Sequence, residues 1–170
     1  MTTNHAFGSA RWPIQYEELV RHLGDLDGAE TVQPPHAFYQ LVVVGGHLFL
    51  PWLYAKTPGT RMREAPLGRS FGHLAREVTT HLGPPPPWTQ LALPLTHPDD
   101  EEDARQVAEI RSSLRSLDPA PKVAIVGYAC NAQLGLFGVS WGEAALVEGK
   151  QLHWFHAEEL AVPQDTGEKA

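Results

Sequence analysis

The most specific chemical string in this chain lies between positions 97 and 101. It reads His97-Pro98-Asp99-Asp100-Glu101 and follows a run of strand-forming residues at 89–95. An imidazole and several carboxylates this close together can bind a metal ion or move a proton. The same residue types also begin helices, because proline suits a first turn and carboxylates complement the positive end of the helix dipole. The string therefore predicts either a reactive site or a helix N-terminus.

This string resembles the signature of a family of zinc-dependent de-N-acetylases, which act on N-acetyl sugars and related amides. The resemblance covers five of the 170 residues. It implies that His97 and Asp100 bind zinc and that Asp99 acts as the general base on the zinc-bound water. A third zinc ligand would come from His153 or His156, which are spaced H-x-x-H near the C-terminus.

A second pair of reactive residue types is formed by the single cysteine and a distant histidine. Cys130 follows the apolar run 122–129, and His47 follows Val44-Gly45-Gly46. A histidine and a cysteine at neighbouring strand ends resemble the dyad of caspase-like cysteine proteases, in which the imidazole activates the thiol. The alternative is that Cys130 is a small buried hydrophobic residue, which is the more common role of a lone cysteine.

Aromatic residues gather in the C-terminal part of the chain. Trp141, Trp154 and Phe155 occur close to His153 and His156. Strand alternation puts His153 and Phe155 on one face and Trp154 and His156 on the other. One of these faces is expected to bind a protein partner or a small ligand, and the alternative is that the tryptophans pack in the core.

The elements that position these residues follow from hydrophobic periodicity. Helices are expected at 13–23, 67–82 and 98–117, with a loop at 24–33. Further strands are expected at 89–95, 122–129, 134–141, 144–147 and 151–155.

Two local features complete this outline. Apolar runs on both sides of Gly45-Gly46 predict a β-hairpin, in which Pro51 would weaken the second strand or place it at an edge. The strand–helix–strand order from 89 to 129 predicts a right-handed βαβ crossover.

The predicted fold class is α+β. We expect a single compact domain over residues 1–162, with a mixed, mainly antiparallel sheet, about three helices and one βαβ crossover. A flexible polar tail is expected at 163–170.

Composition narrows the function classes. The net charge of −7 argues against nucleic acid and against an anionic membrane surface as partners, because both attract basic proteins. One cysteine, no apolar N-terminal segment and no apolar run long enough to span a bilayer favour the cytoplasm.

We therefore expect a non-catalytic binding or accessory protein. Its surface would be the aromatic-rich sheet with Trp141, Trp154 and Phe155, and its partner a protein or a small molecule. A homodimer is an additional expectation. Two alternatives stay open: a zinc-dependent amide hydrolase that uses His97, Asp99 and Asp100, and a hydrolase with a Cys130–His47 dyad.

Overall fold

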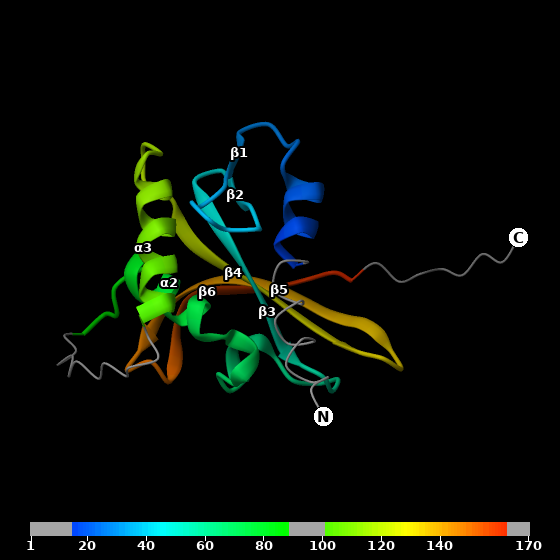
Figure 1. Cartoon of the computed structure of the whole chain (residues 1–170). Helices are drawn as coiled ribbons and strands as arrows, with labels where there is room; N and C mark the ends of the chain where they lie inside the picture. The colour runs from blue at the N-terminus through cyan, green and yellow to red at the C-terminus, as the bar shows by residue number, and fades with distance from the viewer. Residues whose placement is uncertain (1–14, 89–100, 163–170) are drawn as a thin grey trace, which may run out of the picture.

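A computed structural model describes residues 15–88 and 101–162 of the chain, and within these ranges six strands form one sheet (Figure 1). The strands are β1 (Ala29–Val32), β2 (Leu41–Val44), β3 (His47–Ala55), β4 (Lys122–Asn131), β5 (Gly135–Val147) and β6 (Gln151–Leu160). The helical elements are an N-terminal helix (15–23), the 3-10 turns η1 (Met62–Glu64) and η2 (Arg69–Phe71), and the helices α2 (His73–Leu82) and α3 (Glu101–Arg115). In this part of the chain, no helix has the length and apolar character needed to cross a membrane.

The strands follow each other across the sheet in chain order, and β3 and β4 form its parallel pair. The other neighbouring strands are antiparallel. Parallel neighbours need a long crossover, which here contains α2 and α3. The predicted α+β class with a mixed, mainly antiparallel sheet and one crossover is confirmed. The crossover starts from β3, however, and the expected strand at 89–95 lies outside the described residues.

The hairpin between β2 and β3 turns at Gly45 and Gly46, as predicted. Both residues have positive φ, +57° and +76°, which a two-residue primed turn requires and which glycine adopts without strain. The prediction for Pro51 is correct only locally. β3 has partners on both sides, but β2 pairs only with His47 and Leu48, so among the described residues no strand pairs with β3 on that side when it reaches Pro51.

Some predicted boundaries were wrong. The expected loop at 24–33 contains the short edge strand β1. The separate strands expected at 134–141 and 144–147 are one continuous strand, β5, which runs through two glycines. Gly138 faces the Tyr54 ring and Gly142 faces the Trp154 ring, where a Cβ would lie 2.8 Å from Trp154 Cζ3. These glycines therefore make room for aromatic rings and do not end the strand.

One face of the sheet is covered by α2 and α3, which lie together against it (Figure 1). The buried positions of β3 alternate, with Leu48, Leu50 and Trp52 nearly inaccessible. Leu48 and Leu50 share a core cluster with Val78 of α2 and with Ile110 and Leu114 of α3. The intervening residues of β3 consequently point to the other face.

The N-terminal helix reaches both faces of the sheet. Tyr16 belongs to the core cluster beneath α2 and α3, and its ring centroid lies 5.5 Å from that of Tyr39. Burial, followed by the neighbouring Tyr39, raises the pKa of Tyr16 above its usual value. Burial and then the charge of Glu109 raise the pKa of Tyr39 in the same direction.

Candidate functional site

The face of the sheet opposite α2 and α3 carries a groove of about 860 Å³. Its lining combines the N-terminal helix with alternate residues of the central strands. From the helix come Gln15, Glu18, Leu19, His22 and Leu23, and from the sheet come His47, Phe49, Pro51, Ala124, Val126, Tyr128, Leu136, Val139, Trp141 and Leu160. Most of these side chains are apolar, so the groove is a hydrophobic surface with few polar groups.

The floor of the groove is built from residues aligned across strands. Phe49 is paired with Ala124 and Pro51 with Val126, and Val126 is paired in turn with Trp141. Paired residues in a sheet point to the same face, so these side chains form successive rows that run across the strands. Because both faces of β3 and β4 are apolar, burying one face under α2 and α3 leaves the second for the groove.

One wall of the groove is the N-terminal helix. Gln15 Nε2 donates a hydrogen bond to the Tyr128 hydroxyl of β4 and so ties the first turn of the helix to the sheet. Leu19 and Leu23, one and two turns further along, line the groove from the same helix.

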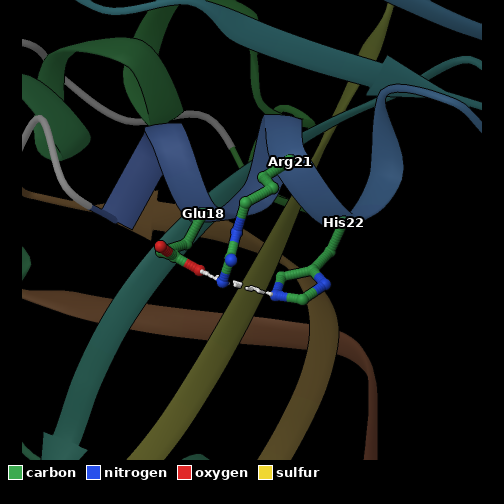
Figure 2. Close-up of polar contacts among 3 residues, drawn as sticks. All are labelled: Glu18, Arg21 and His22. Atoms are coloured by element: carbon green, nitrogen blue, oxygen red, sulfur yellow. Dashed lines mark hydrogen bonds and ion pairs between the residues drawn. The ribbon is translucent and has the colours of Figure 1, made fainter.

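The rim of this wall is polar. Figure 2 shows Glu18, Arg21 and His22 on the N-terminal helix, with the Arg21 guanidinium between the other two side chains. Arg21 Nη2 donates to Glu18 Oε2 and lies 3.2 Å from His22 Nε2. All three side chains are half or more exposed, so these contacts order the rim and contribute little to stability.

A histidine–glutamate pair lies next to the floor of the groove. His47 Nε2 lies 3.0 Å from Glu143 Oε1, although His47 is on β3 and Glu143 on β5, with β4 between them. The second ring nitrogen, Nδ1, lies 3.1 Å from the carbonyl oxygen of Gly45. Both ring nitrogens therefore face an acceptor. On β4, the residue paired with His47 is Lys122, and Ala124, two residues further along, is fully buried.

Trp141 connects the groove to the outer strand β6. Its ring lines the groove, its centroid lies 4.8 Å from that of His156, and its Nε1 donates to Glu158 Oε2 at 3.1 Å. The ring contact and the hydrogen bond orient the indole, so Trp141 is a preorganised part of the groove wall.

The predicted alternation of the C-terminal aromatic residues was wrong for Trp154 and His156. Glu143 is paired with His156 and Ala144 with Trp154, so Phe155 is the extra residue of a β-bulge. The bulge reverses the alternation. Trp154 consequently packs against the core cluster on the α2 side, whereas His156 contacts Trp141.

The remaining aromatic residues form a separate contact group. The His153 ring lies between Trp88 and Phe155, with centroid distances of 5.0 and 5.2 Å. Phe155 is 47% exposed and does not line the groove. Of the predicted binding surface of Trp141, Trp154 and Phe155, the groove thus contains Trp141.

The structure separates the two members of the predicted cysteine–histidine dyad. His47 is paired with Lys122 at the start of β4, and Cys130 lies near the end of the same strand. At a rise of about 3.3 Å per residue, the distance along β4 is roughly 26 Å. The interpretation as a dyad was therefore wrong, because parallel pairing puts His47 beside the beginning of β4.

The zinc hypothesis stays a prediction. His97, Asp99 and Asp100 lie outside the described residues. Within 15–88 and 101–162, the structure contains no group of three His, Cys, Asp or Glu side chains placed to hold a metal ion. His153 and His156 contact different aromatic rings, those of Trp88 and Phe155 for the first and that of Trp141 for the second.

Known proteins add no assignment. Comparisons of the chain with protein-family models, with curated proteins and with solved structures found no match.

Sequence reasoning did not find the groove or the partnership of His47 with Glu143. One signal was present in the sequence. Phe49, Val126 and Val139 are apolar at strand positions that alternate with the buried core, and a strand that is apolar on both faces needs cover on both. The pairing across β4 could not be seen, because it depends on sheet order and register.

Proposed function

We propose that this chain is a non-catalytic binding protein that holds a small apolar molecule in the groove. The observation that carries the proposal is the groove itself, about 860 Å³ in volume and lined mostly by apolar side chains. Sites for small molecules are typically concave and apolar, with volumes of about 300–1,000 Å³ and a few oriented polar groups. Here those polar groups are His47 and the hydrogen-bonded pair of Gln15 and Tyr128.

The position of the polar groups favours binding over catalysis. A general base needs a free lone pair within hydrogen-bonding distance of the proton that it removes. Both nitrogens of His47 already face acceptors, the carbonyl of Gly45 and the carboxylate of Glu143. Cys130, the other reactive side chain considered, lies far along β4 from this histidine.

The proposal can be tested with a neutral apolar dye, N-phenylnaphthylamine, whose fluorescence rises in a hydrophobic pocket. We expect saturable binding of about one dye per chain. Val126→Trp should weaken binding by about tenfold or more, because the larger ring projects from the centre of the floor into the space for the ligand. Leu134→Trp is the matched control, since Leu134 is exposed outside the groove.

Two further measurements make the result decisive. Circular dichroism verifies that each variant is folded, and Val139→Trp narrows the groove from β5 if Val126→Trp fails to fold. Binding that is lost in the groove variants and kept in Leu134→Trp supports the proposal. Absence of saturable dye binding, or equal binding by all variants, contradicts it.

A further inference from the structure

At one end of the groove, the hydrogen-bonding groups of His47 and Glu143 indicate which class of ligand the groove accepts. His47 Nε2 reaches Glu143 Oε1 across the intervening strand β4, over two strand spacings of roughly 4.8 Å each. Phe49 is paired with Ala124, and Trp141 precedes Glu143 by two residues on the same face of β5. The histidine–glutamate pair therefore lies next to the apolar floor, where the polar end of a bound molecule would meet it.

Glu143 has unused acceptor capacity. A carboxylate has about four lone-pair sites on its two oxygens. In the described part of the chain, the interaction that Glu143 makes is the one between Oε1 and His47. Its side chain is 30% exposed, so a ligand can still reach it. The carboxylate can accept at least one more hydrogen bond.

The imidazole of His47 has no free nitrogen for a hydrogen bond with a ligand. Its Nε2 faces Glu143 and its Nδ1 faces the carbonyl of Gly45, so both ring nitrogens are taken. A ligand that approaches this end of the groove finds an acceptor on Glu143, and finds no donor on the imidazole. The end of the groove is therefore complementary to a hydrogen-bond donor.

The charge at this end of the groove also disfavours an anionic ligand. Glu143 lies beside the floor next to His47, and the whole chain has a net charge of −7, whereas the charge of Glu18 on the helix wall is paired with Arg21. An anionic head group would meet like charge at the end of the groove, and like-charge juxtaposition is an effective way to exclude a ligand.

On the basis of the proposed function, we propose that the groove selects apolar molecules that carry a hydrogen-bond donor, a hydroxyl or an amine, and that Glu143 accepts that hydrogen bond. Apolar carboxylates are excluded. A site built around a polar partner discriminates strongly, because a ligand without that group leaves the site's polar atom unpaired.

Three ligands of equal chain length test this selection: decanol, decylamine and decanoate. Each is used to displace N-phenylnaphthylamine, at ligand concentrations below those at which that ligand forms micelles or a separate phase. In the unmodified chain, decanol and decylamine should bind about tenfold or more tightly than decanoate. Glu143→Gln removes the negative charge and should bring the affinities for decylamine and decanoate to within about threefold of each other. Glu30→Gln, on the edge strand β1, is the control and should leave the order unchanged.

The outcomes separate the two proposals. If the dye itself does not bind, the proposed function fails. If the dye binds but decanoate displaces it as well as decanol does, the ligand class is wrong while the groove stands. If Glu143→Gln leaves the original preference intact, Glu143 is not the selecting group. Circular dichroism at each ligand concentration verifies that displacement does not come from unfolding.

Discussion

His47 Nε2 and Glu143 Oε1 lie 3.0 Å apart, although a whole strand separates β3 from β5. The contact links the first residue of β3, which lines the groove, to a residue of β5 beside the groove.

This link predicts measurable coupling between the two side chains. A double-mutant cycle with His47→Ala and Glu143→Ala should give an interaction free energy of about 0.5–1 kcal/mol, the range for a partly exposed pair. Urea unfolding of the four proteins supplies the free energies of unfolding. The cycle of Glu143→Ala with Arg115→Ala, on α3, is the control and should be additive. Additivity in both cycles would mean that the pair does not form.

A second prediction concerns the close approach of η1 to the sheet. A Cβ on Gly127 of β4 would overlap the Met62 sulfur and lie 2.8 Å from Tyr54 Cδ1. Gly127→Ala should therefore lower the free energy of unfolding by about 1–3 kcal/mol, the cost of overpacking a core.

Gly68→Ala is the matched control for that substitution. Gly68 has open space around its Cβ position and no positive φ, so the change should be neutral or stabilise by up to about 1 kcal/mol. Chemical denaturation of both variants provides the comparison. Equal stability of the two variants would show that Met62 does not pack over Gly127.

The bulge at Phe155 predicts that two nearby residues behave differently. Trp154 packs on the core cluster, so Trp154→Ala should cost about 2–3 kcal/mol, less than for a fully buried tryptophan. His156 is half exposed on the other face, and His156→Ala should change stability by about 0.5 kcal/mol or less. Urea unfolding distinguishes them. If both substitutions lowered the free energy of unfolding by similar amounts, the side chains of β6 would alternate between the two faces without a bulge at Phe155.

Tyr16 predicts a loss of stability at alkaline pH. Its pKa is raised by burial, so the folded state keeps the phenol protonated while the unfolded chain loses the proton above about pH 10. Stability from this group is complete below pH 10 and should then fall by about 1.4 kcal/mol per pH unit.

Urea unfolding between about pH 9 and 11 measures this loss. Tyr16→Phe removes the titrating group, so its stability should decline less steeply with pH than that of the unmodified chain. Lysine titration is common to both proteins and cancels in the comparison. The same slope in both proteins would show that Tyr16 ionises freely in the folded state.

Features that depend on local interactions could be predicted from the sequence, and features that depend on contacts between distant strands could not. The hairpin at Gly45-Gly46 was predictable because its turn needs two residues at positive φ, a local requirement. The continuity of β5 was not, because Gly142 lies between the expected strands 134–141 and 144–147, and the sequence does not place the rings of Tyr54 and Trp154 against Gly138 and Gly142. Those rings come from other strands, so no sequence pattern within β5 predicts that they lie against these glycines.

The candidate site was harder to predict for the same reason. His47 was recognised as a reactive residue, but it was assigned to Cys130 because both follow apolar runs. The partner depends on β3 and β4 being parallel, which puts His47 beside Lys122 and brings it within range of Glu143. A one-residue bulge at Phe155 similarly decides which face Trp154 occupies. Such register effects become visible only once the sheet is assembled.

A methyl-detected NMR titration of the isotopically labelled chain with decanol shows most directly whether the groove binds an apolar molecule. We predict shifts in the groove methyl groups of Leu19, Val126 and Val139, with the core methyl groups of Ile110 and Leu114 unchanged. Shifts confined to surfaces outside the groove, or no shifts at saturating decanol, would contradict the assignment of this groove as a binding site.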